Sequence, residues 1–178
     1  MFQTARLLLR PVQPEDNEAI FVYRSDATTN RYQSSLPSSI EEVDALIQSN
    51  PREFNISKTW YQLAIIEKSS GSLIGDIGVH FIDNAQCEFG CTLAKKYHRK
   101  GYATEALQSL IEHLFSILDK HRITASIDPR NVGSIQLFER LGFRKEGYFI
   151  QSLYINGEWV DDLIYAVLAS EWRERNLD

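Results

Sequence analysis

Between residues 60 and 93, apolar positions fall in three short runs that turn-forming residues separate. The runs contain isoleucine, valine and aromatic residues, which fit a pleated, half-buried surface, and Ser-Ser-Gly and Asp-Asn lie between them. Runs of this length with short turns are typical of antiparallel strands that follow one another. The pattern therefore predicts an antiparallel meander at residues 60–67, 73–82 and 87–93.

Four more runs have a strand-like composition, and they occupy residues 4–10, 122–127, 143–154 and 158–168. The last two flank Asn156 and Gly157, and Asn-Gly between strand-like runs is the strongest short signal for a hairpin. Glycines inside strands usually mark a bulge or a close approach to the backbone, and such glycines are Gly75, Gly78 and Gly90. The chain is therefore expected to form about seven strands.

A long stretch from about residue 101 to residue 120 has apolar residues at helical spacing and charged residues opposite them. It predicts an amphipathic helix whose apolar stripe covers a sheet. The strand that follows, at residues 122–127, is short and β-branched, so we expect it to run parallel to the strand before the helix. These segments together predict a right-handed β-α-β unit.

Start and stop signals mark three shorter helices. An acidic first turn begins one of them, Ser39 and Glu42 fit a Ser-x-x-Glu capping box for the second, and Asn131 is a suitable N-cap for the third. Gly142 is placed to stop that third helix. The elements together predict an α/β fold with a mixed, mostly antiparallel sheet of about seven strands flanked by about four helices.

The composition limits the domain count and the classes of partner. A chain of 178 residues with 43% hydrophobic content suits one domain, at residues 1–178. A formal charge of −5 argues against broad nucleic-acid binding, which needs a basic surface. No stretch approaches the roughly 18 apolar residues of a membrane helix, and the first ten residues lack a signal-peptide core. We therefore expect a cytoplasmic protein with no membrane partner.

The two cysteines do not form a recognisable metal motif. Cys87 and Cys91 lie four residues apart in one strand, and neither a second cysteine pair nor a histidine cluster accompanies them. Metal sites need three or four such ligands at suitable spacing. Free thiols and no metal site are therefore expected.

The stretch at residues 91–106 is the strongest candidate for chemistry. It combines the end of a strand, a basic turn with Gly101, and the first turn of the long helix. The first N–H groups of a helix have no internal partner and lie at the positive end of its dipole, so this junction can hold an anion. A phosphate cradle and an ordinary solvated loop are both consistent with the sequence.

Four separated motifs give this stretch a family context. They are His98-Arg99-Lys100-Gly101-Tyr102-Ala103, Thr4 to Pro11 in the pattern Thr-x-Arg-Leu-x-Leu-Arg-Pro, Asn131 and Ser134 followed by Leu141-Gly142-Phe143, and Asn156-Gly157-x-Trp159-x-Asp161. In this order the motifs resemble the Gcn5-related N-acetyltransferases (GNAT), in particular the branch that includes the ribosomal-protein N-terminal acetyltransferases. The resemblance spans nearly the whole chain.

The resemblance implies acetyl-CoA as the acetyl donor. Its pyrophosphate would lie on the backbone N–H groups of Arg99, Lys100, Gly101, Tyr102, Ala103 and Thr104. Its pantetheine arm would follow the backbone at Thr92 and Leu93, with Gly90 marking a bulge nearby. Asn131 and Ser134 would face the sulfur end of the donor. Asn131 is equally suited to cap its helix, and one side chain can do both.

The implied reaction is direct attack of an amine on the thioester. Glu88 is our candidate base, acting through a water, and its alternative reading is an exposed strand carboxylate; His80 and Asp76 are weaker candidates. Many relatives use a tyrosine as the acid, but this chain has Phe138 at that position, so the role falls to Ser134. An α-amine has a pKa near 7.7–8.0, against about 10.4 for lysine, so an N-terminal acceptor loses its proton most easily.

Several functions remain open from the sequence. A protein N-terminal α-amine is the first expected acceptor, and a small-molecule amine such as a polyamine or an amino-sugar is the alternative. A catalytically silent CoA-binding sensor is a further reading, because Phe138 and Leu153 depart from residues that relatives carry. A nucleic-acid patch at residues 95–100 is the last. Homodimer formation is left open.

Overall fold

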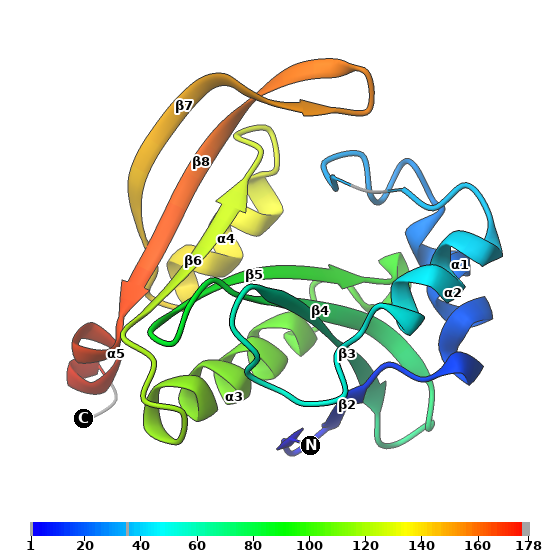
Figure 1. The fold of residues 1–178 in the computed structure, drawn as a ribbon, viewed down its shortest axis with the longest axis horizontal. Helices are drawn as coiled ribbons and strands as arrows, with labels where there is room; N and C mark the ends of the chain where they lie inside the picture. The colour runs from blue at the N-terminus through cyan, green and yellow to red at the C-terminus, as the bar shows by residue number, and fades with distance from the viewer. Residues whose placement is uncertain (1, 35, 176–178) are drawn as a thin grey trace.

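The computed structural model describes residues 2–34 and 36–175, and its strands form a single sheet (Figure 1). The strands lie in the order β1-β2-β3-β4-β5-β6-β8-β7. Their bounds are β1 Phe2–Gln3, β2 Leu7–Pro11, β3 Thr59–Glu67, β4 Leu73–Phe81, β5 Gln86–Leu93, β6 Arg122–Ile127, β7 Arg144–Ile155 and β8 Glu158–Leu168. Every neighbouring pair is antiparallel except β5 and β6, which are parallel. The predicted mixed, mostly antiparallel sheet is confirmed.

Helices cover both faces of this sheet. Their bounds are α1 Asn17–Arg24, α2 Ile40–Gln48, α3 Tyr102–Ser116, α4 Val132–Arg140 and α5 Ala169–Arg175, with short 3-10 turns at Pro14–Asp16 and Lys95–Tyr97. Leu63 and Ile65 of β3 belong to the core that α3 and α4 close, whereas Ala64 packs with α1 and α2. Because successive strand residues point to opposite faces, α3 and α4 cover one face and the α1–α2 pair covers the other.

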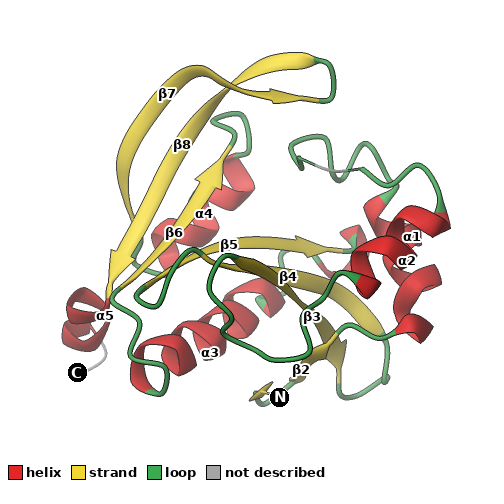
Figure 2. Cartoon of the chain, viewed as in Figure 1, coloured by secondary structure: helices red, strands yellow, loops and turns green. Residues whose placement is uncertain are grey.

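The sheet opens between its two parallel strands (Figure 2). β5 pairs with β6 only from Gln86 to Glu88, whereas its antiparallel pairing with β4 continues to Leu93. Beyond Glu88 the facing edges of β5 and β6 therefore have no ladder partner in each other. The predicted β-α-β unit is present, and the opening lies at the end of β5 from which the chain turns into α3.

The sequence pattern located seven of the eight strands and four of the five α-helices within the described residues. It missed β1, whose two residues are too short to show a period, and α5, a short polar helix after β8. It also placed the end of α3 near residue 120, but the helix ends at Ser116. None of these differences touches the opening between β5 and β6.

The predictions made from local sequence signals were confirmed only in part. Asn131 does cap α4, since its side chain accepts a hydrogen bond from the backbone of Ser134, and Gly142 follows that helix with a φ of 89°. Two predictions were wrong. The β4–β5 register runs without interruption through Gly90, so no bulge occurs there. The Ser39–Glu42 capping box is also absent, since Ser39 is the N-cap of α2 without a side-chain cap hydrogen bond and Glu42 accepts instead from the backbone and hydroxyl of Ser38.

No helix in the described part of the chain combines the length and apolar character that crossing a bilayer requires.

Candidate active site

A cavity of about 700 Å³ lies where β5 and β6 separate, between the starts of α3 and α4. It brings together most of the residues that the sequence marked for the acetyl donor. These are Thr92, Leu93, Arg99, Gly101, Tyr102, Ala103, Thr104, Asn131 and Ser134. Two marked residues, Lys100 and Glu88, are not part of its wall. The loop after α1 contributes Thr29, Asn30 and Gln33, which the sequence pattern did not single out.

The turn into α3 has a backbone suited to anions. Gly101 is the N-cap of α3 with a φ of 80°, and Arg99 also has a positive φ, of 59°. Left-handed residues in a short turn let successive N–H groups converge, which creates a concave anion site. Gly101 has no side chain to cap the first N–H groups of the helix, so those groups stay available to a bound oxyanion. The geometry favours the phosphate cradle over a plain loop.

The lysines and the arginines near this basic turn are placed differently. The ammonium groups of Lys96 and Lys100 lie 5.0 and 5.6 Å from the ring centroid of Tyr97, and neither lysine lines the cavity. Arg99 and Arg140 do line it, and Arg140 also borders a second, open hollow of about 690 Å³ beside α3. Arg140 lies at helical spacing from Gly133 and Gln136, which also line the cavity.

The edge of β5 is placed by its neighbours on both sides. Gly75 of β4 passes so close that a Cβ there would lie 2.2 Å from the carbonyl oxygen of Thr92, so only glycine fits. The Nε2 atom of His98 lies 2.8 Å from the carbonyl oxygen of Leu93. Because a carbonyl only accepts, that nitrogen must donate the proton. His98 therefore ties the basic turn to the end of β5.

Cys91 lines the cavity but is unsuited to nucleophilic attack. Burial raises the pKa of its thiol to about 12, with the negative charge of Asp76 acting in the same direction. The thiolate is the nucleophilic form of cysteine, and this environment disfavours it. The site therefore favours direct attack of the acceptor over a cysteine-bound acyl intermediate.

Ser134, in the first turn of α4, lines the cavity. The Oδ1 atom of Asn131 accepts from the backbone N–H of Ser134 at 3.2 Å, which fixes the first turn of the helix. Within residues 2–34 and 36–175, the Ser134 hydroxyl has no hydrogen-bond partner of its own. A hydroxyl in this position is free to donate to a bound group.

Glu88 lies at the last β5–β6 pair, in a row with two aromatic residues on adjacent strands. Trp60 is in register with His80, and His80 is in register with Glu88. The rings of Trp60 and His80 stack at 4.8 Å, and the Nδ1 atom of His80 lies 3.8 Å from the Glu88 carboxylate. Burial raises the pKa of Glu88, while His80 opposes that shift. A carboxyl group with a raised pKa is a better proton acceptor near neutral pH.

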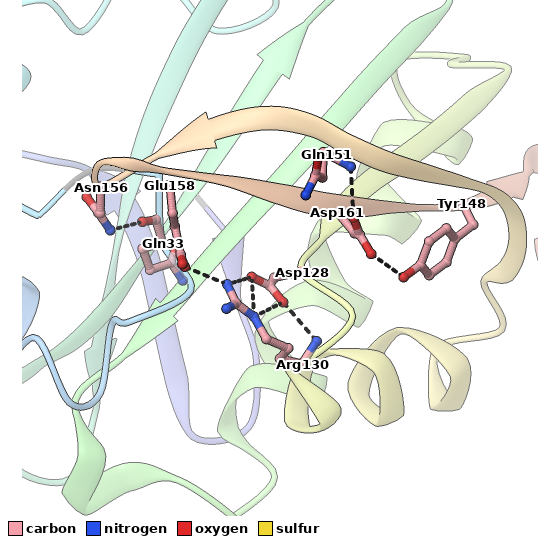
Figure 3. Close-up of polar contacts among 8 residues, drawn as sticks. All are labelled: Gln33, Asp128, Arg130, Tyr148, Gln151, Asn156, Glu158 and Asp161. Atoms are coloured by element: carbon pink, nitrogen blue, oxygen red, sulfur yellow. Dashed lines mark hydrogen bonds and ion pairs between the residues drawn. The ribbon is translucent and has the colours of Figure 1, made fainter.

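The hairpin of β7 and β8 extends beyond β6 and meets the loop after α1 (Figures 1 and 3). Its tip has Asn156 and Gly157 at φ values of 50° and 89°, as the Asn-Gly signal predicted. The side-chain amide of Asn156 donates to the backbone carbonyl of Gln33 at 3.4 Å. Since Gln33 also lines the cavity, the hairpin contacts the cavity wall through the loop after α1.

Arg130 supports this contact from below, between Asp128 and Glu158 (Figure 3). Its guanidinium donates to the Asp128 carboxylate at 2.7 Å and to Glu158 at 3.0 Å. Farther along the hairpin, Asp161 accepts from the hydroxyl of Tyr148 and from the backbone of Gln151. These bonds engage each of the three carboxylates within the protein itself.

Comparison with known proteins identifies this architecture. Residues 6–144 match the family model described as an acetyltransferase (GNAT) domain. The chain belongs to the GNAT family. A crystal structure of a GNAT acetyltransferase from Bacillus anthracis is similar, with a TM-score of 0.86 and 30% identity over 95% of this chain and 98% of the other. The uncharacterized N-acetyltransferase YnaD of Bacillus subtilis (strain 168) is 31% identical over 95% of this chain and 97% of its own.

Two relatives with named substrates match over shorter stretches. The ribosomal protein uS5-alanine N-acetyltransferase of Escherichia coli (strain K12) is 37% identical over 48% of this chain and 44% of its own length. The spermidine N(1)-acetyltransferase of Vibrio cholerae is 26% identical over 63% and 66%. From its membership of this family, the GNAT protein is an acetyl-CoA-dependent N-acetyltransferase.

Proposed function

We propose that this GNAT enzyme transfers the acetyl group of acetyl-CoA to the α-amine of a protein N-terminus. The observation that carries the proposal is the state of the carboxylates on β4, at the end of β6 and on β8. Asp76, Asp128, Asp161 and Glu158 are each bound to an arginine or tyrosine, and Asp162 accepts from the hydroxyl of Ser126. A polyamine carries several positive charges and needs several free carboxylates. A peptide with one terminal amine needs only the pair formed by Glu88 and His80.

Different residues of the cleft bind different parts of the donor. Arg99, Gly101 and the first turn of α3 hold the pyrophosphate through backbone N–H groups, and Arg140 supplies a nearby positive charge. The unpaired edge of β5 at Thr92 and Leu93 holds the pantetheine arm. Acetyl-CoA supplies an acyl thioester, which an unprotonated amine attacks. Holding both reactants in one cleft supplies much of the acceleration.

Glu88 accepts a proton from the attacking amine through a water and returns it to solvent, while Ser134 donates a proton to the departing sulfur and is reprotonated from solvent. The new bond joins the amine nitrogen to the acetyl carbon, and the bond from that carbon to sulfur breaks. Ser134 suits the second task because it lines the cavity and Asn131 fixes the helix turn that carries it. The buried Phe138 has no hydroxyl for this purpose.

Ser134→Ala is expected to lower kcat about tenfold while leaving the KM for acetyl-CoA within about twofold. A thiolate leaves more easily than an amine or alkoxide, so the loss lies below the roughly 100-fold that general acids commonly contribute. Steady-state kinetics with each substrate varied in turn measures the two constants. Asn131→Ala is the matched comparison, because it removes the helix cap and leaves the hydroxyl. An unchanged kcat in the Ser134 variant would remove this residue from the chemistry.

Glu88→Gln is expected to lower kcat and, unusually for an active-site change, to stabilise the protein at neutral pH. The raised pKa of Glu88 means that the folded protein binds its proton more tightly than the unfolded chain, whose carboxyl group titrates near 4.3. Stability therefore falls as pH rises from the unfolded pKa through the folded one. Glutamine cannot ionise and avoids that loss.

Thermal unfolding of both proteins at pH 4 and pH 7.5 measures this effect. The Tm of the variant, relative to that of the parent protein, should be higher at pH 7.5 than at pH 4. The reason is that the parent protein pays the cost of an ionised, partly buried Glu88 only at the higher pH. Equal Tm differences at both pH values would show that burial does not disfavour the charged form of Glu88.

Mass spectrometry of products tests the proposed acceptor. The enzyme is incubated with acetyl-CoA and three sets of amines: peptides with free N-termini, the same peptides with a blocked N-terminus and an internal lysine, and spermidine. Acetylation of the first set alone supports the proposal. Turnover of spermidine alone would replace it with a small-molecule function. Tight CoA binding by calorimetry without turnover of any amine would indicate a silent CoA sensor.

A further inference from the structure

Arg6, in the short turn between β1 and β2, contacts the start of α3 at three points. Its Nε atom donates to the Glu105 carboxylate at 2.6 Å, and its Nη1 atom donates to the carbonyl oxygen of Lys100 at 3.0 Å. Its guanidinium carbon also lies 4.4 Å from the ring centroid of Tyr102. One side chain from the N-terminal strands therefore touches three residues of the turn and first helical turn that form the anion cradle.

The bond to Lys100 sets the direction of a cradle N–H group. In a trans peptide the carbonyl and the next N–H point in opposite directions. The carbonyl of Lys100 points to Arg6, so the N–H of Gly101 points away from Arg6. Gly101 lines the cavity, and a Cβ on it would lie 3.3 Å from the Nη2 atom of Arg6, so Arg6 lies directly behind this peptide.

The hydrogen bonds to Glu105 offset its negative charge. This carboxylate lies in the first turn of α3, where it would repel a bound pyrophosphate. Arg6 binds it through both its side chain and its backbone N–H, and the hydroxyl of Thr4 donates to it at 2.5 Å. These bonds lower the pKa of Glu105, so it stays ionised and paired on the side of α3 that faces the N-terminal strands.

We propose that Arg6 is a positioning residue for acetyl-CoA, which aligns the Lys100–Gly101 peptide and neutralises Glu105 beside the pyrophosphate. The inference rests on the proposed donor site at residues 99–104, and it does not depend on the identity of the acceptor amine. It gives the N-terminal Thr-x-Arg motif a role that the strand itself does not explain.

The test compares Arg6→Met with Arg52→Met, which removes the same charge from an exposed residue far from α3 in sequence and absent from both hollows. Arg6→Met should weaken CoA binding by calorimetry about tenfold and raise the KM for acetyl-CoA similarly, since charge-assisted hydrogen bonds are stronger than neutral ones. kcat and the KM for the amine should change less than twofold. Arg52→Met should leave all of these constants unchanged.

S-acetyl-pantetheine separates positioning from general damage, because this donor has the thioester but no pyrophosphate. Arg6→Met should use it as well as the parent enzyme does, and Glu105→Gln added to Arg6→Met should recover part of the lost CoA affinity. If Arg6→Met does not fold, Arg6→Lys provides the same comparison with the charge retained and the second hydrogen bond lost. Parent protein that binds no CoA would overturn the donor site itself. Parent-like CoA binding by the folded variant would overturn the role of Arg6 alone.

Discussion

Gly101→Ala is expected to weaken CoA binding tenfold or more, the largest single effect on the donor site. Gly101 has a φ of 80°, a left-handed conformation that costs other residues roughly 1–2 kcal/mol. Alanine can relieve that cost only by changing the backbone, which would turn the cradle N–H groups away from the cavity. An added Cβ would also approach the Nη2 atom of Arg6 at 3.3 Å, a tight contact that would require a small shift of this side chain.

Gly71→Ala is the matched control for this change. Gly71 has a φ of 68° in the turn between β3 and β4, and nothing lies within 4 Å of where its Cβ would be. It should lose a comparable, modest stability, about 1 kcal/mol, and bind CoA like the parent protein. Calorimetric titration with CoA and urea unfolding of both variants provide the comparison. Parent-like affinity in Gly101→Ala would mean that the pyrophosphate lies elsewhere.

The proposed donor site could be located from the sequence because its residues are local in sequence. A strand end, a glycine turn and a helix start occupy consecutive residues, and the physics of a helix N-terminus applies wherever such a junction occurs. Asn131 was equally accessible, because a cap bonds to a residue three positions away. Short-range patterns of this kind can be recognised in the sequence, because tertiary contacts do not change the sequence separation of the residues that form them.

The remaining site residues come from long-range pairings that no periodicity encodes. Arg6 lies 99 residues from Glu105, and Asn156 lies 123 residues from Gln33. The loop after α1 offered no period to interpret, yet the buried Asn30 fixes it by donating to the carbonyls of Tyr23, Arg24 and Asp26. Side chains such as these gain their role only when the sheet brings distant segments together.

Asp76 is a candidate base that the sequence allows but that its surroundings in the fold make unsuitable. It was a weaker candidate base, but its carboxylate is buried and already accepts from the hydroxyl of Tyr23 at 2.6 Å and from the guanidinium of Arg24. The same bonds hold the end of α1 against β4, just before the loop that reaches the cavity with Thr29 and Asn30. Its role is therefore to anchor one wall of the active site.

Asp76→Asn is expected to lower the free energy of unfolding by about 3–5 kcal/mol, because it leaves the largely buried Arg24 without a counter-charge. Tyr23→Phe removes one hydrogen bond and should cost only about 1 kcal/mol. Urea unfolding measures both.

The double change Arg24→Met with Asp76→Leu removes both charges, so it should cost less than Asp76→Asn alone. If the double variant is instead the less stable of the two, the attraction between the charges exceeds the cost of burying them. In either case the loop after α1 loses its anchor, and the KM for the amine should rise more than the KM for acetyl-CoA. A larger rise in the KM for the amine would place the loop after α1 on the acceptor side of the cavity, whereas an equal rise in both constants would not.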